Sequence, residues 1–463
     1  MAGVSKLVAA FALALGIAPL TDDSLRPEVD RLVAAVSAAR HLTFRGTLPA
    51  HALTREEATR TAELAASEGT ESVRARTEGE ILKRLGLIPA AADYGGEAAR
   101  AYGDNASPGA RYDASTGRLL VPDFIPLEAQ RTVMAHEVAH AIADQHFGLR
   151  KILEIAPDGT PRLDGDAERA RLALVEGDAL LTGLELVDPR ESFLGAHELG
   201  LLAGRLRAAA ASEAPSWFSE LGQFTHVDGL LFVARVRAHH PFGAVDALWN
   251  DPPASSEQIL HPEKYDACEA PIAVDEAALP TLAGFGRPTA SDVLGELGVW
   301  AWLASALPAE VAARAAAGWG GDRAGLYTAT PERAPADGGA ATSGAPLAWM
   351  TVWDDAAEAD DFARAARQLL ARASRSLTPG GIALPDRSSD DDRTIFSTPE
   401  GAFALARRGD AVAMLFAAPE PAGPALDLML EAVRPRANRR AAPRPRRAAQ
   451  PGCPRRARAA GLP

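Results

Sequence analysis

The sequence has 463 residues, of which 47% are hydrophobic and 24% are charged. At about 150 residues per domain this length predicts two to four domains, and the composition of an ordinary globular chain excludes wholesale disorder, a fibrous repeat and a polytopic membrane protein. The formal net charge of -13 argues against a nucleic-acid partner, because phosphate backbones bind basic surfaces. Two cysteines are too few for a disulfide framework or for a zinc site built from thiolates.

The amino-terminal segment has the pattern of a secretory signal. Lys6 precedes an apolar run over Leu7–Leu20, which is shorter than the stretch of about 20 residues that a membrane-spanning helix needs. We therefore predict a signal peptide or an amino-terminal anchor over 1–20, and an exported protein that is secreted, periplasmic or bound to the cell envelope. Beyond that anchor we predict no integral membrane domain. An amino-terminal core helix is the alternative interpretation of the same run.

The region 21–330 is predicted to be mainly helical, with one small sheet. Apolar residues recur at helical spacing over 27–87, 166–186, 198–211, 230–238, 244–249 and 291–316. Pro126 suits the first turn of a further helix, and Gly148 can end that helix. Arg118–Val121 predicts a short strand, the polar stretch Ser255–Tyr265 predicts a loop, and Gly318–Asp322 predicts a tight turn.

The carboxy-terminal part has a different organisation. A segment rich in Pro, Gly, Ala and Thr predicts a linker over 331–346, and the stretch 436–463 is rich in Arg, Pro and Ala and predicts a disordered tail. Between them, the patterns predict strands over 349–353, 394–397, 402–407 and 411–416 and helices over 356–370 and 425–433. This predicts a small α/β domain over 347–435, so the fold class of the whole chain is α+β.

The motif His136-Glu137-Val138-Ala139-His140 lies inside the helix predicted after Pro126. Side chains four positions apart lie on the same face of a helix, so His136 and His140 can offer two imidazole nitrogens to one tetrahedral metal ion. Glu137 is one position away, where it can hold and deprotonate a metal-bound water. Surface histidines beside an ordinary helix glutamate are the alternative interpretation.

A hydrolytic zinc site has three protein ligands and one open position, so two histidines need a partner. Glu176 is a carboxylate in an otherwise apolar helical segment, Leu174–Leu181, and burying it without a partner would be costly. The 36 positions between His140 and Glu176 leave room for a loop and a returning helix. We therefore predict Glu176 as the third ligand of a zinc ion (Zn2+), with a solvated or ion-paired glutamate as the alternative.

Four further residues are candidates for supporting roles. Asp144 and Asp178 are candidates to accept the second ring N–H of a ligating histidine, with surface or capping acids as the alternative. In the segment His261-Pro262-Glu263-Lys264-Tyr265, either His261 or Tyr265 is a candidate donor to the oxyanion that forms in hydrolysis; an anchor for the loop is the alternative. His226 is predicted to be a surface residue.

These residues together resemble the zinc metallopeptidases of the glutamate-zincin type, which have His-Glu-x-x-His and a downstream Glu. The chain is most similar to a group of largely uncharacterised exported bacterial proteins with that motif. The similarity extends from about Leu85 to Asp355, more than half of the chain. The segments that carry it are Leu85–Ile88, Tyr112–Asp113, HEVAHAIADQHF (136–147), LVEGDA (174–179), SSEQILHPEKY (255–265), GWGGD (318–322) and Trp349–Trp353.

The resemblance implies a zinc ion on His136, His140 and Glu176, with Glu137 as the base. It also implies a zincin-like catalytic region over 21–330, with a small twisted sheet above the metal helix and a helical half below the cleft. In that arrangement the strand at 118–121 is an edge along which an extended peptide substrate can pair.

We therefore expect a zinc metallopeptidase that hydrolyses the peptide bonds of a peptide or protein substrate by Glu-assisted attack of a zinc-bound water. Two alternatives remain open. One is a catalytically inactive zincin-fold binding protein of the cell envelope, and the other is a metal-free interaction protein built on the carboxy-terminal domain.

Overall fold

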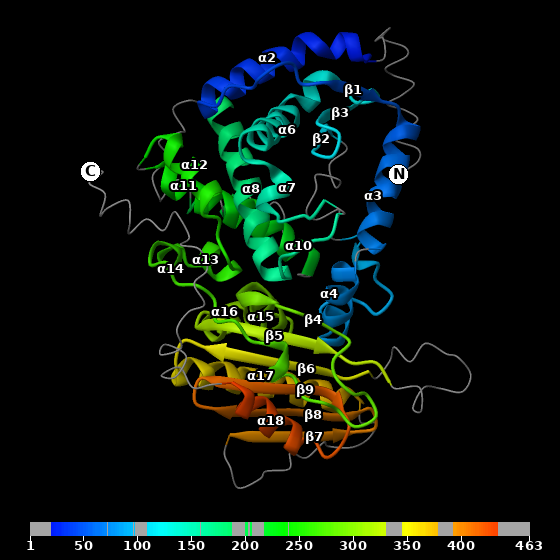
Figure 1. The fold of residues 1–463 in the computed structure, drawn as a ribbon, viewed down its shortest axis with the longest axis vertical. Coiled ribbons are helices and arrows are strands. Elements are labelled where there is room, and N and C mark those ends of the chain that lie inside the picture. The colour runs from blue at the N-terminus through cyan, green and yellow to red at the C-terminus, as the bar shows by residue number, and fades with distance from the viewer. Residues whose placement is uncertain are drawn as a thin grey trace.

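The computed structural model combines helices and sheets, as the α+β prediction requires, with most helices in one half and a six-stranded sheet in the other (Figure 1). It describes residues 20–71, 73–95, 97, 109–157, 159–187, 200–201, 204–205, 217–238, 240–329, 345–377 and 392–433. The predicted signal or anchor over 1–20, the helix over 198–211, the linker and the tail lie wholly or mostly outside these residues. Within them, no helix combines the length and the apolar run that crossing a bilayer would require.

A three-stranded sheet lies at one end of the helical half. Its strands are β1 (Ala50–Leu53), β2 (Arg111–Asp113) and β3 (Arg118–Pro122), in the order β1-β3-β2. The strand predicted at 118–121 is therefore present as β3, but it is not an edge. It pairs in parallel with β1 and antiparallel with β2, so both of its sides are occupied. The prediction that a peptide can pair along 118–121 is wrong, because β1 completes the sheet on that side.

The helix with the His-Glu-x-x-His motif is α6 (Leu127–Phe147), and its predicted ends are confirmed. Pro126 precedes the first turn, and at the other end Gly148 has a φ of 82° and donates its N–H to the carbonyl of Asp144 at 2.9 Å. Side chains on all faces of α6 between Met134 and Ala143 are buried. A helix that is buried all round lies between other elements, and α6 contacts the small sheet on one side and α8 (Gly165–Val187) on another.

The remaining helices of this half lie around α6 and α8 or, like α3 and α4, run along one side from the small sheet to the larger one (Figure 1). They are α2 (Asp22–Arg40), α3 (Arg55–Glu71), α4 (Val73–Arg84), α7 (Leu149–Ile152), α10 (Trp217–Gln223), the π-helix η3 (Phe224–Asp228), α11 (Gly229–Arg237), α12 (Phe242–Asn250), α13 (Ser256–Leu260) and α14 (Pro262–Asp266). The short 3-10 helix η4 (Glu276–Ala278) follows them.

The loop predicted over Ser255–Tyr265 is instead the two short helices α13 and α14. The Ser255 side chain accepts the backbone N–H of Gln258 and caps the first of them, while Pro262 occupies the first turn of the second. Helices of five residues are too short to show a periodicity in the sequence, so only these capping residues indicate them.

The other half is built on the antiparallel sheet β4-β5-β6-β9-β8-β7. Its strands are β4 (Ala290–Asp292), β5 (Trp319–Leu326), β6 (Leu347–Trp353), β7 (Arg393–Thr398), β8 (Gly401–Arg408) and β9 (Ala411–Ala418). The four strands predicted after residue 346 are all present. The two strands β4 and β5 precede the predicted linker, however, so the sheet does not begin at 347 as the domain prediction has it.

The tight turn predicted at Gly318–Asp322 is also wrong, because residues from Trp319 onward form β5. Glycine is needed there for close packing: a Cβ on Gly321 would lie 2.0 Å from the carbonyl oxygen of Ile272. The Ile272 N–H donates to the carbonyl of Gly320 at 2.6 Å, so a neighbouring segment lies directly on the strand.

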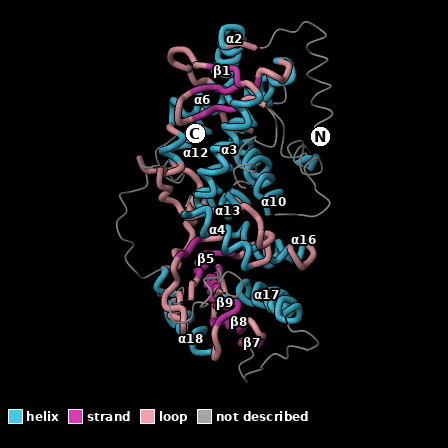
Figure 2. The backbone as a smooth tube through the Cα atoms, turned by 90° about the vertical axis from the view of Figure 1, so that its right-hand side faces the viewer, coloured by secondary structure: helices cyan, strands magenta, loops and turns pink. Residues whose placement is uncertain are grey.

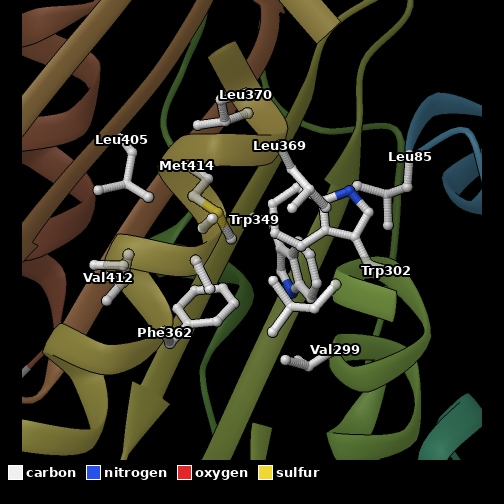
Figure 3. Close-up of a cluster of buried hydrophobic side chains, with 14 of the residues drawn as sticks. Leu85, Val299, Trp302, Trp349, Phe362, Leu369, Leu370, Leu405, Val412 and Met414 are labelled. Atoms are coloured by element: carbon white, nitrogen blue, oxygen red, sulfur yellow. The ribbon is translucent and has the colours of Figure 1, made fainter. Parts of the chain in front are cut away.

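Helices cover both faces of this sheet, with α17 (Ala356–Leu377) and α18 (Gly423–Ala432) on opposite sides (Figure 2). Side chains alternate along β6: Trp349 packs into the cluster on the α17 side, and Met350 packs into the cluster on the α18 side. The helices α15 (Gly295–Ala304) and α16 (Ala309–Ala316) complete the first cluster, in which Trp302 lies against Trp349 with ring centroids 5.3 Å apart (Figure 3).

Buried charges join the two halves. The guanidinium of Arg169, in the second turn of α8, pairs with Glu78 and donates to the carbonyl of Leu294 at 2.9 Å. Asp166, in the first turn of α8, accepts the N–H of Ser256 at 3.1 Å, and Asp292 of β4 accepts the N–H of Gly165 at 2.8 Å. These bonds attach the first turns of α8 to the sheet, so the position of Glu176 further along this helix is tied to both halves.

Candidate metal centre

His136 and His140 face each other from successive turns of α6. Their Nε2 atoms are 2.9 Å apart, their ring centroids are 4.5 Å apart, and both residues are buried. The separation of four positions accounts for this arrangement, because it brings both side chains to the face of α6 that packs on α8.

Glu176 reaches the same point from α8. Its Oε2 lies 3.2 Å from Nε2 of His136 and 3.4 Å from Nε2 of His140. Burial alone would raise the pKa of the Glu176 carboxyl. The charges of His140 and His136 and their hydrogen bonds to the carboxylate have the opposite and larger effect, so this pKa lies well below its ordinary value. The carboxylate is therefore ionised, and its partners are the two imidazoles rather than solvent or a basic side chain.

The three atoms fit a tetrahedral zinc ion. Ligand bonds of about 2.0–2.1 Å place two ligand atoms of a tetrahedron about 3.3–3.4 Å apart. The separations of 2.9, 3.2 and 3.4 Å between the two Nε2 atoms and Oε2 of Glu176 are close to that value. Two imidazoles and one carboxylate are also a donor set that zinc accepts at hydrolytic sites.

Glu137 stands beside this triangle and is not part of it. One of its carboxylate oxygens lies within 4.8 Å of one ring nitrogen of His136 and one of His140, and its Oε2 accepts the backbone N–H of Tyr112 at 2.6 Å. Tyr112 is in β2, the strand at the edge of the small sheet nearest to α6. The sheet therefore fixes the orientation of a buried carboxylate next to the two imidazoles.

A third histidine, His226 on the π-helix η3, also reaches the cluster, although the sequence predicted a surface residue. Its Nε2 lies 3.6 Å from Oε2 of Glu176, and its Nδ1 lies 3.0 Å from the carbonyl oxygen of Gly222. The hydrogen bond to this carbonyl requires a proton on Nδ1, which directs Nε2 toward the carboxylate. The side chain is 25% exposed, so solvent reaches it.

Two glycines bring His226 so close. A Cβ on Gly177 would lie 2.2 Å from the carbonyl oxygen of Gly229, and a Cβ on Gly229 would lie 2.1 Å from the carbonyl oxygen of Ala173. Only glycine allows α8 and the start of α11 to approach at this distance. Gly177 directly follows Glu176. The close approach of α8 to α11 therefore also brings the side chains of Glu176 and His226 together.

The predicted role of Asp178 is wrong. Its carboxylate accepts from Nε of Arg40 at 2.9 Å and from Nε1 of Trp249 at 2.9 Å, and all three residues are buried. The charge of the Arg40 guanidinium attracts this carboxylate more strongly than a neutral imidazole N–H could. Asp178 therefore attaches α8 to α2 and α12 rather than orienting a histidine.

The predicted role of Asp144 is also wrong. Its two oxygens accept the hydroxyl of Tyr112 at 2.8 Å and the backbone N–H of Leu149 at 2.7 Å. The first donor belongs to β2, and the second is the first residue of α7, whose backbone N–H has no partner within its own helix. Among the residues that the structure describes, Nδ1 of the buried His136 has no hydrogen-bond partner.

His261 and Tyr265 have their contacts in other places. Nε2 of His261 lies 2.9 Å from a carboxylate oxygen of Glu296, and the hydroxyl of Tyr265 donates to the carbonyl of Asp251 at 2.7 Å. The Tyr265 ring packs edge-on against Phe232. Neither contact brings His261 or Tyr265 to the His136 cluster, whereas His226 does reach that cluster.

A family model described as a domain of unknown function (DUF8575) matches residues 282–427. The match includes all six strands of the larger sheet and none of the residues in the His136 cluster. No curated protein matches the chain, and no solved structure matches it.

Proposed function

We propose that this chain is a zinc-dependent metallopeptidase. The observation that supports it most directly is the meeting of three ligand atoms, from His136, His140 and Glu176, at the mutual distances of a tetrahedral zinc site with Glu137 alongside. The resemblance of the motif and of the downstream glutamate to glutamate-zincins points to the same reaction.

In this proposal His136, His140 and Glu176 hold the ion. A zinc ion there supplies a Lewis acid, which polarises a scissile carbonyl and makes water more acidic. Glu137 takes the proton of the attacking water and passes it to the leaving amine. The N–H of Tyr112 donates to one oxygen of Glu137 and so holds the carboxylate in place beside the two imidazoles.

His226 is the proposed donor to the oxyanion. Its Nε2 is directed toward the cluster by the bond from Nδ1 to the carbonyl of Gly222. When this ring is protonated, Nε2 can donate to the oxygen that becomes negative as the carbonyl is attacked. In this proposal His226 of η3, rather than His261 or Tyr265, is the hydrogen-bond donor to the oxyanion.

The substrate is proposed to be a peptide or protein in extended conformation. Among the residues that the structure describes, the strand β2 pairs only with β3, and the backbone of Tyr112 is in contact with Glu137. An extended chain that pairs along β2 therefore runs past the proposed base. On the amino-terminal pattern of Lys6 and Leu7–Leu20, we propose that the protein is exported and meets its substrate outside the cytoplasm.

The second candidate function is a zincin-like binding protein that holds the ion without turnover. The observation that favours it is His226, because a fourth protein ligand would close the open position that hydrolysis requires. Nε2 of His226 lies 3.6 Å from Oε2 of Glu176, a separation that a fourth tetrahedral ligand could also have, so the zinc content of a His226→Ala variant separates the two functions.

The substitution Glu137→Gln tests the proposal. It keeps the shape of the side chain and removes its basicity, so hydrolysis of a peptide library should fall at least about 100-fold while zinc content is unchanged. The matched control is Glu128→Gln on the same helix, where the side chain is 73% exposed and activity should be retained.

Full activity of Glu137→Gln would reject the proposed mechanism. A wild-type protein that contains zinc and cleaves nothing in the library would instead support the binding protein.

A further inference from the structure

A cavity with a volume of about 300 Å³ lies between α10, η3, α13, α15 and α16. Three carboxylates line it, those of Glu220, Asp228 and Glu296, and none of the described residues that line it is a lysine or an arginine. Acidic side chains alone do not make a binding site, but here one of them is in an unusual state.

Glu296 is 4% exposed, and only one of its oxygens has a partner. Oε1 lies 2.9 Å from Nε2 of His261, which also lines the cavity, whereas Oε2 has no hydrogen-bond partner among the described residues. The free-energy cost of burying a carboxylate oxygen without a hydrogen-bond donor exceeds the net free energy that an ordinary hydrogen bond contributes. A ligand that supplies a donor to this oxygen removes that cost, which favours its binding.

The other walls of the cavity show which kind of donor fits. Phe224 and Trp300 contribute aromatic rings, and Leu260 and Leu297 contribute apolar surface. Aromatic faces beside carboxylates attract an organic cation on an apolar stem. A metal ion fits less well, because among the described residues three metal-ligating side chains converge at His136 and not here.

We propose that this cavity binds an organic cation, an ammonium or guanidinium group at the end of a short apolar chain. The charged end bonds to Glu296, and the stem lies against Phe224 and Trp300. Such a group belongs either to a basic side chain of a peptide or to a free amine. The proposal does not depend on the metal centre, because none of the proposed zinc ligands lines the cavity.

Titration of the full-length protein with n-butylguanidinium and with n-butylurea tests the proposal, because the two compounds have the same shape and differ in charge. Binding is followed by calorimetry, with and without a chelator. The guanidinium should bind with a dissociation constant on the order of 1 mM, a value typical of ligands of this size, and at least tenfold more tightly than the urea in both conditions. Equal affinities for the two compounds would overturn the proposal.

Two variants locate the site. Glu296→Gln should weaken guanidinium binding at least tenfold, while Glu310→Gln, at an exposed position of α16 outside the cavity, should leave it unchanged. Ala313→Lys places a competing ammonium at an exposed position that lines the cavity, and it should weaken binding similarly without disturbing the core. If Glu296→Gln does not fold, Ala313→Lys decides, and unchanged binding in the folded variants overturns the proposal.

A lysine-containing tripeptide, blocked at both ends, distinguishes the two sources of the cation. If it binds more tightly than n-butylamine, the ligand is a basic side chain of a peptide. If n-butylamine binds at least as tightly as the tripeptide, the ligand is a free amine.

Discussion

His226 is the residue whose role most affects the chemistry of the cluster. In the proposal it donates to the oxyanion and does not hold the ion, so His226→Ala should lower kcat by about 100- to 1000-fold and leave zinc content unchanged. The measurement is peptide hydrolysis together with metal analysis of the purified variant. His240→Ala, at an exposed position, is the control and should behave like wild type.

A different result has an equally clear meaning. If His226→Ala loses its zinc as readily as His140→Ala does, His226 is a fourth ligand. The site is then closed, and the binding protein replaces the peptidase as the better account.

The convergence of His136, His140 and Glu176 could be predicted from the sequence, for physical reasons. His136 and His140 are related by helix geometry, which is local, and Glu176 is indicated by the cost of leaving a carboxylate in an apolar helix without a partner. The role of His226 depends on a contact across 50 positions, from 176 to 226, and no local rule connects the two residues. Gly229, three positions after His226, was the available signal, since a glycine inside an apolar helix often marks a close approach.

At the scale of the elements, the crossing of α8 with α11 is the feature that substitution tests best. Gly177→Ala places a methyl group 2.2 Å from the carbonyl oxygen of Gly229, so the two helices must separate. The free energy of unfolding should fall by about 1–3 kcal/mol, as in other overpacked contacts, and hydrolysis should fall as His226 moves away from Glu176. Urea denaturation and the peptide assay measure the two effects.

Gly183→Ala in the same helix is the matched control. A Cβ there has no heavy atom within 4 Å, so the substitution should be neutral or stabilising by up to about 1 kcal/mol, because alanine favours helix more than glycine does. Equal effects of the two substitutions would mean that the glycine contact does not determine how the helices pack.

Element boundaries were predictable where local chemistry marks them. Pro126 and Gly148 mark both ends of α6, and the predicted strands after residue 346 agree with β6 to β9 within two residues at each end. The sequence did not predict β4 and β5, because these strands form by pairing with each other and with β6 across distant parts of the chain. Gly320 and Gly321 indicate a turn when they are considered alone. In the structure they belong to a strand, and glycine is needed there because the segment at Ile272 packs directly against the backbone of that strand.

At the scale of the whole molecule, the buried junction of the two halves predicts a dependence of stability on pH. Burial raises the pKa of Asp166 from 3.8 to about 7, although the charge of Arg169 and the hydrogen bond from Ser256 oppose the change. The folded state therefore keeps a proton that the unfolded chain releases at lower pH. The retained proton therefore contributes its full amount to the free energy of unfolding below about pH 4. This contribution decreases as the pH rises to about 7, by at most about 1.4 kcal/mol per pH unit.

Asp166→Asn removes this titration and retains an oxygen that can accept from Ser256. The free energy of unfolding of wild type, minus that of the variant, should therefore decrease between about pH 4.5 and pH 7.5. Urea denaturation at both pH values measures it, with Asp23→Asn at an exposed position as the control. A difference that stays constant or grows with pH would show that Asp166 is ionised throughout in the folded protein.

The same junction attaches the larger sheet to residues on the amino-terminal side of the predicted linker. Asp292 and Leu294 of the matched segment 282–427 bond to the first two turns of α8, while Glu176 of that helix lies in the cluster. The composition of the sequence indicates a break at 331–346, but the sheet begins earlier and is attached to α8, the helix that carries Glu176. Such contacts between distant parts of a chain are absent from any local pattern.

The zinc content of the purified protein tests the central claim most directly. After dialysis against equimolar zinc and removal of free metal, elemental analysis of wild type should find one zinc ion per chain, and His140→Ala and Glu176→Gln should retain far less. A wild-type protein without bound zinc, or one whose zinc content is the same in both variants, would contradict the account.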